Sequence, residues 1–274
     1  MIATPIGNFA DITLRALHVL ALVNRVAAED TRHTAQLLAR YQITRPLLAV
    51  HKHNERSAAQ KIINFLRLGE RIAYVSDAGT PGISDPGARL VDEVQNAGLS
   101  IVAIPGASAV TAALSVTGHL ANTFTFAGFL PTKPKQRNDR LQELAAHQET
   151  LVFYEAPHRT LETVRALAEI LGSSRRILIA KEITKLHESL HQCRLVEAPA
   201  WLTADPNRLR GEFVLVVEGA TSLPIRSDVH HYDIILKALL NEVPVRTAVK
   251  LAVVLTGVSR SVLYTSALKL IEGK

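Results

Sequence analysis

Short apolar runs alternate with longer amphipathic stretches in the first part of the chain. Runs at residues 26–28, 47–50, 72–75 and 101–104 are rich in β-branched and small apolar side chains, as expected for buried strands. Between them, Leu14, Leu17 and Leu20 follow a near-helical spacing, which is typical of a helix that covers a sheet. The alternation predicts an α/β domain over residues 1–118.

A second series of the same kind follows residue 118. Strand-like runs at 124–129, 151–154, 177–180 and 213–217 accompany an amphipathic helix at 161–171, which ends at Gly172. This pattern predicts a second α/β domain over residues 119–223. Within it, Leu130–Arg140 is rich in lysine, arginine and proline, which predicts an exposed basic loop leading into a helix. Such a loop either contacts RNA or is only solvated, and both interpretations remain open.

Helical periodicity dominates the C-terminal part of the chain. Three helices are predicted at residues 232–240, 244–256 and 259–270, with Gly257 just past the end of the second and Ser259 at an N-cap position of the third. A short glycine turn between two helices is typical of a helix-turn-helix unit, which we predict over residues 228–274. A small three-helix cap that packs on its neighbour is the alternative.

Composition and charge narrow the class of protein. The chain has 274 residues, 47% of them hydrophobic, so it can bury a core without disulfides, and its single cysteine, Cys193, favours a reducing compartment. Residues 1–11 lack the pattern of a signal peptide, and the longest small and apolar stretch, Ile101–Val116, is too short to span a bilayer. We therefore expect a cytoplasmic protein with no membrane role. A formal charge of +6 permits binding to a polyanion without requiring it.

Several familiar catalytic motifs are absent from the sequence. No glycine-rich dinucleotide motif follows the first predicted strand, and no phosphate-binding loop of the Gly-x-x-x-x-Gly-Lys type occurs. Gly106–Val110 has the serine of a nucleophile elbow, Ser108, but lacks its second glycine, which disfavours a serine hydrolase. The pairs His51/His53 and His187/His191 lack the further ligands of a recognisable metal site, so we expect no bound metal.

Three turn motifs stand at or near strand ends, where α/β sheets bind their ligands. Ser76–Gly87 follows the predicted strand at 72–75 and contains three glycines and two prolines in twelve residues. Such a backbone brings main-chain N–H and C=O groups close to a small molecule. Pro105–Ala109 and Thr4–Asn8 are similar turns with small side chains. Together they predict a small-molecule site, whereas any one of them alone is compatible with a purely structural turn.

Five motifs resemble one protein family closely. They occur in the order found in the tetrapyrrole methylase superfamily, and the resemblance covers essentially the whole chain. Within the superfamily, these motifs and the terminal helical unit resemble the branch that methylates ribosomal RNA, and not the members that act on tetrapyrroles. Only Met1, Ile2 and Ala3 precede the turn that begins at Thr4, so we expect the first strand to be short. The five motifs are Ala3–Asn8, Ala28–Thr34, Ser76–Gly87, Phe153–Arg159 and Lys181–Lys185.

This resemblance implies a fold, a cofactor and a reaction. The implied fold is α/β, with two domains, a cleft between them that binds S-adenosyl-L-methionine, and a helix-turn-helix-like extension. The implied reaction is 2′-O-methylation of a cytidine ribose in small-subunit (16S) ribosomal RNA, carried out by a homodimer. The implied cofactor contacts, mostly through the backbone, are Gly7, Asp77, Gly79, Thr80, Pro81, Ile83, Ser108, Ala109 and Tyr154.

Methylation of a ribose hydroxyl calls for a base and for groups that position the RNA. A hydroxyl is a poor nucleophile at neutral pH, and a nearby side chain can take its proton. Arg32, Arg159 and Lys185 are the expected phosphate ligands. The carboxylates lie beside cations in the sequence, so ion pairs that hold the cleft together are the alternative role for each. The candidate catalytic residues are Glu29, Asp30, Arg32, Glu155, Arg159 and Glu182, with His33 and His158 as weaker candidates.

Two other functions remain compatible with the sequence. A methylase of the same fold could act on a tetrapyrrole or another small molecule, although the basic loop and the terminal helices would then have no role. An RNA-binding assembly factor without catalysis is the second alternative. Calorimetric measurement of cofactor binding distinguishes the assembly factor from either enzyme, and methyl transfer to ribosomal RNA distinguishes the two enzymes.

Overall fold

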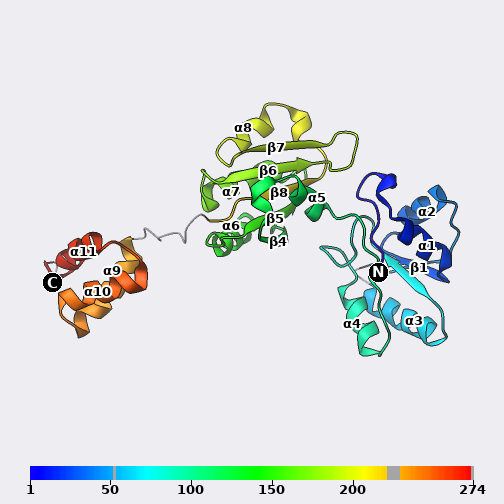
Figure 1. Ribbon diagram of the computed structural model, residues 1–274, viewed down its shortest axis with the longest axis horizontal. Helices are drawn as coiled ribbons and strands as arrows, with labels where there is room; N and C mark the ends of the chain where they lie inside the picture. Colours follow the sequence, from blue (N-terminus) through cyan, green and yellow to red (C-terminus); the bar gives the residue numbers. More distant parts are fainter. Residues whose placement is uncertain (52–53, 221–228, 273–274) are drawn as a thin grey trace.

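The computed structural model describes residues 1–51, 54–220 and 229–272 and consists of two α/β domains followed by a helical unit (Figure 1). The predicted α/β class is therefore confirmed. The predicted limits at residues 223, 228 and 274 lie outside the described residues, so the exact domain boundaries stay a prediction.

The first domain has a parallel sheet with helices on both faces. Val26 and Ala28 pack with α1 (Leu14–Leu22) and α2 (Thr31–Arg40), whereas Ala27 packs on the opposite face with α3 (Glu55–Arg67) and α4 (Ala88–Asn96). Strands buried on both faces explain the continuous apolar runs in the sequence. In sheet order the strands are β2 (Leu47–Ala49), β1 (Arg25–Ala28) and β3 (Ile72–Val75).

The first residues extend this sheet by a short segment beside β3. The Ile2 N–H donates to the Tyr74 carbonyl at 2.9 Å, and the Ile104 N–H donates to the Met1 carbonyl at 2.9 Å. The predicted strand at 101–104 is wrong, because only Ile104 forms a bridge, to Ile2. The ladder stops there because the first segment turns away at Thr4, which pairs instead with Gly79.

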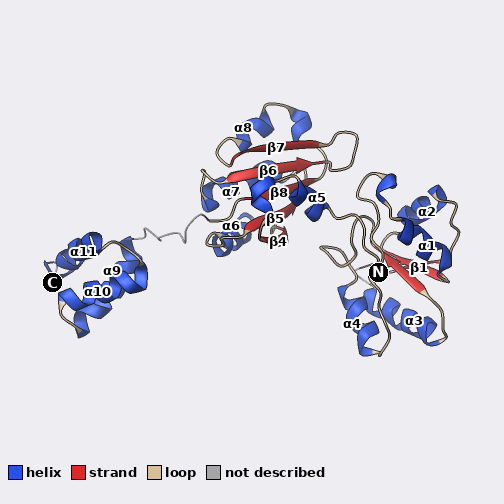
Figure 2. Ribbon diagram, viewed as in Figure 1, coloured by secondary structure: helices blue, strands red, loops and turns tan. Residues whose placement is uncertain are grey.

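The second domain has a five-stranded mixed sheet (Figure 2). Apolar side chains pack on both faces of this sheet. One face packs against α6 (Pro134–Leu144), α7 (Thr160–Leu171) and α8 (Ala198–Thr203). In sheet order the strands are β4 (Phe124–Phe129), β5 (Thr150–Glu155), β8 (Phe213–Val217), β6 (Arg176–Lys181) and β7 (Ser189–Arg194), with β4 and β5 parallel and the other pairs antiparallel.

The other face of the second sheet is covered by α5 (Ala109–Ser115), which comes from the part of the chain before residue 118. Its side chains Val110, Ala113 and Leu114 pack against Val152 on β5 and Val216 on β8. Side chains that precede residue 118 thus belong to the core of the second sheet, and the domain limit at residue 118 stays a prediction. Short 3-10 helices complete the two domains at Phe9–Asp11, Gly118–Ala121 and Pro206–Leu209.

Two parts of the chain differ in detail from the sequence pattern. The exposed loop predicted at Leu130–Arg140 is wrong in part, because α6 begins at Pro134 and the Arg137 side chain is buried beside Glu162 at 3.4 Å. Proline at the first helical position costs no hydrogen bond and sets the backbone angle for a helix. The edge strand β7 is not predicted by the apolar pattern.

The C-terminal unit has a core of its own. It consists of α9 (Val229–Glu242), α10 (Val245–Thr256) and α11 (Arg260–Glu272), and its buried side chains include Leu236, Ala252 and Leu263. α10 ends at Gly257 in a left-handed conformation, as the sequence predicts.

Candidate functional site

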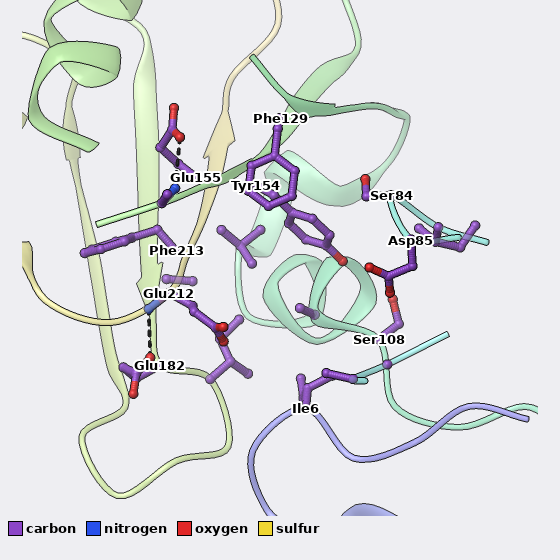
Figure 3. Close-up of a pocket in the computed structure, with 18 of the residues that line it drawn as sticks. Ile6, Ser84, Asp85, Ser108, Phe129, Tyr154, Glu155, Glu182, Glu212 and Phe213 are labelled. Atoms are coloured by element: carbon purple, nitrogen blue, oxygen red, sulfur yellow. Dashed lines mark hydrogen bonds between the residues drawn. The ribbon is translucent and has the colours of Figure 1, made fainter. Parts of the chain in front are cut away.

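A cavity of about 330 Å³ lies between the two domains, at the carboxyl ends of β3, β5 and β6 (Figure 3). Its volume is within the range of small-molecule sites. The first domain contributes Ile6, Ala78, Gly79, Thr80, Ile83, Ser84, Asp85, Ser108 and Ala109. The second domain contributes Phe129, Tyr154, Glu155, Ala156, Pro157, Ala180, Glu182, Ile183, Lys185, Glu212, Phe213 and Val214.

The three turns of the first domain are joined by backbone hydrogen bonds. The Thr4 N–H donates to the Gly79 carbonyl at 2.9 Å, and the Gly79 N–H donates to the Thr4 carbonyl at 3.0 Å. The Thr80 hydroxyl donates to the Ala107 carbonyl at 3.2 Å. Gly79 has φ +73, and a Cβ there would lie 3.3 Å from Ile6 Cγ2, so glycine meets both a backbone and a steric requirement. The three turns therefore form one wall of the cavity.

Tyr154 forms the opposite wall. Its ring contacts Phe126 and Phe129 edge to face, at centroid distances of 4.9 and 5.6 Å. Its hydroxyl points across the cavity toward Asp85 and Ser108 (Figure 3). Burial raises the pKa of Tyr154, although the nearby Val110 N–H opposes this shift. The phenol is therefore neutral at physiological pH and available as a hydrogen-bond donor.

Three carboxylates of the first domain, Glu29, Asp77 and Asp85, influence one another electrostatically, and we call them the acidic edge. Burial raises the pKa of Glu29, and the charges of Asp77 and Asp85 raise it further. Burial and the charge of Asp77 likewise raise the pKa of Asp85, which a hydrogen bond from Ser76 partly offsets. Asp77 is held in place by the Asp30 N–H, which donates to it at 2.9 Å. Of the carboxylates in this group, Glu29 and Asp85 thus have pKa values that are raised toward the pH at which a base would work.

Asp30 and Arg32 are an exposed pair at the start of α2. Asp30 caps the helix, accepts the Arg32 N–H at 2.8 Å and pairs with the Arg32 guanidinium at 2.7 Å. Arg32 holds the pKa of Asp30 well below its usual range. The Arg32 side chain is 88% exposed, so it can reach a large partner.

Glu155 and Arg159 are a buried pair at the end of β5. Arg159 Nε lies 3.2 Å from Glu155 Oε1, and the Thr163 hydroxyl donates to Glu155 Oε2 at 2.5 Å. Arg159 also donates to the Leu130 carbonyl, next to Phe129 in the cavity wall. With its carboxylate committed in this way, Glu155 fits the ion-pair role better than that of a proton acceptor.

Glu182 belongs to a second network, on the far side of the cavity. Its carboxylate accepts the Glu212 N–H at 2.7 Å and the Lys185 ammonium at 3.0 Å, and Lys185 also contacts Glu212 at 2.8 Å. Burial alone would raise the pKa of Glu182, but these hydrogen bonds outweigh it and lower the pKa. The same two carboxylates raise the pKa of Lys185 against the effect of its burial.

Comparison with known proteins identifies the fold of this site. Residues 1–199 match the family described as Tetrapyrrole (Corrin/Porphyrin) Methylases. The chain belongs to this family. The family resemblance and the fold predicted from the five motifs are thereby confirmed. Residues 228–271 match the family described as the RsmI C-terminal HTH domain, which supports the helix-turn-helix interpretation.

Relatives of this methylase extend over nearly its whole length. It is 48% identical to "Ribosomal RNA small subunit methyltransferase I" of Xylella fastidiosa strain Temecula1, with 96% of each chain covered. It is 41% identical to the protein of the same name from Haemophilus influenzae, covering 99% of this chain and 96% of the relative. A crystal structure of uroporphyrin-III C-methyltransferase from Thermus thermophilus complexed with S-adenosylhomocysteine shares the fold, with 18% identity, TM-score 0.56, and 79% and 95% of the two chains covered.

The methylase structure brings most of the expected cofactor contacts together. Gly79, Thr80, Ile83, Ser108, Ala109 and Tyr154 line the cavity, as do the candidate catalytic residues Glu155 and Glu182. Pro81 lines an adjoining groove instead. The expected residues outside the cavity lining are Gly7, Asp77, Glu29, Asp30, Arg32 and Arg159.

Sequence reasoning missed several residues of this methylase site. Asp85 lies in the same turn as Gly79, so its place in that motif was an available signal. Phe213 begins the antiparallel strand β8, opposite the ends of β5 and β6. A search confined to the carboxyl ends of strands passes over such a position. The remaining missed residues are Ile6, Ala78, Ser84, Phe129, Ala156, Pro157, Ala180, Ile183, Glu212 and Val214.

Two absences apply to the described part of the chain. Within residues 1–51, 54–220 and 229–272, no three His, Cys, Asp or Glu side chains form a group that could hold a metal ion. His53 lies outside these residues. No helix among those the structure describes is long and apolar enough to cross a membrane.

Proposed function

We propose that this methylase transfers a methyl group from S-adenosyl-L-methionine to the 2′-oxygen of a cytidine ribose in small-subunit (16S) ribosomal RNA. The observation that carries the proposal is the nearly full-length similarity, at 41–48% identity, to relatives named ribosomal RNA small subunit methyltransferase I. The match of residues 228–271 to the RsmI C-terminal HTH domain also supports the proposal, because these residues lie outside the part of the chain that matches the methylase family.

The cavity fits the cofactor in size and lining. Small side chains at Ala78, Ala109 and Ala180 and the glycine at 79 leave the space open, and a Cβ at Gly79 would press on Ile6 of the cavity lining. We assign cofactor contacts to Gly79, Thr80, Ile83, Ser108, Ala109 and Tyr154, and supporting positions to Gly7, Asp77 and Pro81. When bound, the cofactor supplies an electrophilic methyl group on its sulfonium.

We assign the base function to the acidic edge. A general base works best when its pKa lies near the working pH, and Asp85 and Glu29 have raised pKa values. Asp85 lines the cavity and faces the Tyr154 hydroxyl, whereas Glu29 is not part of the cavity lining and is the alternative. Glu155, Arg159 and Glu182 hold the walls, and Asp30 orients the exposed Arg32 for a phosphate of the RNA.

The direct test is transfer of labelled methyl groups to ribosomal RNA. Small subunits and deproteinised 16S RNA from cells lacking this protein are incubated with the enzyme and labelled cofactor, and the product is mapped by mass spectrometry. We expect one methylated cytidine ribose. Cofactor binding without transfer to any ribosomal substrate would argue against the proposal, and transfer to a tetrapyrrole would favour the small-molecule alternative.

We also propose that the enzyme acts in the cytoplasm, where ribosomal subunits are assembled, as a homodimer. The exposed side chain of Phe124 lines an apolar groove together with Pro105 and Phe126. Burial of such a surface by a second copy would be favourable. Light scattering of the purified protein should give twice the chain mass, and a monomer at micromolar concentration would contradict the dimer.

A further inference from the structure

Lys185 of the second domain lies directly against Gly7 of the first. A Cβ at Gly7 would overlap Lys185 Cγ and would lie 2.9 Å from its Cε, so the aliphatic part of the lysine covers the glycine backbone. Gly7 belongs to the Thr4–Asn8 turn, whereas Lys185 follows β6. This contact therefore joins the two domains beside the cavity, which Lys185 also lines.

The ammonium of Lys185 is held from the other side. It contacts Glu182 at 3.0 Å and Glu212 at 2.8 Å, and its side chain is 27% exposed. Two carboxylates thus already pair with the Lys185 ammonium, which is expected from the sequence to bind a phosphate of the RNA. Because its ammonium pairs with Glu182 and Glu212 and its aliphatic chain packs on Gly7, Lys185 can fix the distance between these two parts of the chain.

The segment that carries Lys185 has an unusual backbone. Glu182 has φ +52 and Thr184 has φ +69, both in the left-handed region that non-glycine residues rarely adopt. The Glu182 side chain fits only because residue 211 is glycine, where a Cβ would lie 2.5 Å from Glu182 Cγ. Such strained residues cluster at ligand clamps and active sites.

The Thr4–Asn8 turn connects the contact between Lys185 and Gly7 with the cavity wall. Ile6, next to Gly7, lines the cavity and packs beside Gly79, and Thr4 is hydrogen-bonded to Gly79. A displacement of the turn therefore moves both Ile6 and Gly79.

We propose that Lys185 is a positioning residue that latches the Thr4–Asn8 turn to the second domain and so fixes the width of the cofactor cavity. Glu182 and Glu212 hold its ammonium, and its aliphatic chain presses on Gly7. The inference rests on the proposed use of the cavity for S-adenosyl-L-methionine, and it separates Lys185 from the phosphate ligands.

The experiment compares Lys185→Ala, Lys185→Met and the control Lys61→Ala, an exposed lysine on α3 outside the cavity lining. Lys185→Ala removes the aliphatic chain, and Lys185→Met keeps most of it without the charge. We expect Lys185→Ala to weaken cofactor binding on the order of tenfold in calorimetry, because small misplacements in a site have large effects. Lys185→Met should have an intermediate effect and Lys61→Ala none, while the KM for RNA changes less than about twofold in all three.

Hydrogen exchange provides a readout that needs no ligand. Amide exchange in residues 4–8 should accelerate in Lys185→Ala, with the amides of α7 unchanged as a control for folding. Unchanged cofactor affinity and unchanged exchange would overturn the latch, and a raised KM for RNA alone would identify Lys185 as a phosphate ligand. If the unmodified enzyme fails to bind the cofactor, the proposed function is wrong, and the exchange measurement still decides the latch.

Discussion

The carboxylate of Glu155 is completely buried, and Arg159, four residues later, lies against it at 3.2 Å with 14% of its side chain exposed. Glu155 ends β5 and Arg159 precedes α7, so the pair fixes the turn between them. Through its bond to the Leu130 carbonyl, Arg159 also ties the end of β4 to the same turn. Two walls of the cavity therefore depend on one ion pair.

Arg159→Ala should lower the free energy of unfolding by about 3–5 kcal/mol, because it leaves a buried carboxylate without its partner. Denaturant unfolding measures the change. Arg140→Ala is the matched control, since it breaks the exposed pair with Glu143 and should cost less than about 1 kcal/mol. The double variant Glu155→Gln with Arg159→Met should recover part of the loss, and equal effects of the two single arginine variants would refute the buried-pair argument.

Asp85→Asn should lower kcat on the order of 100-fold or more, if Asp85 accepts the proton of the ribose hydroxyl. The carboxylate acts as a base only when ionised, so the rate should rise with pH through the raised pKa of Asp85. The acid limb of the kcat profile should therefore lie above the usual carboxylate range. Asp85→Asn should abolish this limb with cofactor affinity largely retained. A Glu29→Gln variant that loses the limb instead would assign the base to Glu29.

Gly79→Ala and Gly82→Ala separate backbone strain from contact with the cofactor. Both glycines have positive φ, +73 and +83, so alanine at either should destabilise the fold by about 1–2 kcal/mol. Only Gly79 lines the cavity and faces Ile6, whereas a Cβ at Gly82 meets nothing within 4 Å. Calorimetry should therefore show weaker cofactor binding for Gly79→Ala alone. Equal losses in both variants would mean that strain, and not contact, controls the affinity.

Arg32→Ala should raise the KM for RNA several-fold and leave cofactor affinity unchanged. Its guanidinium is exposed, and loss of one phosphate contact should reduce the salt dependence of binding by about one unit of slope. Arg67→Ala is the control, because Arg67 is exposed at the end of α3, near the amino end of β3 and away from the cavity. Filter binding at several salt concentrations measures both. An unchanged slope for Arg32→Ala would remove Arg32 from the RNA-binding surface.

The sequence predicts the apolar strands well, but it misses the more polar edge strand β7 and mistakes the run at 101–104 for a strand. Phe213–Val217 is recognisable because β8 is central and apolar on both faces. Ser189–Arg194 is not, because β7 has one neighbour and alternates between half-buried and exposed positions, several of them polar. The run at 101–104 is apolar like a strand, but its ladder ends where Thr4 turns toward Gly79.

The residues of the site also differ in how far the sequence reveals them, because some belong to local motifs and others depend on contacts between distant parts of the chain. The turns that contain Gly79, Thr80 and Ser108 are found in the sequence because glycine-rich turns are a local feature, and the family resemblance implies that these residues contact the cofactor. The roles of Arg159, Glu182 and Lys185 depend on partners far along the chain, and spacing alone does not reveal these contacts. Leu130 is such a partner of Arg159, and Glu212 is one of both Glu182 and Lys185.

The position of α5 has a consequence for how this chain can be divided. A fragment that begins at residue 119 would keep all five strands of the second sheet but lose the helix that covers one of its faces. Val152, Leu178 and Val216 would then be bare to water, an apolar surface that invites aggregation. A fragment meant to fold alone has to start before Ala109, and it would then carry Ser108 of the cofactor wall away from the domain whose turns complete that wall.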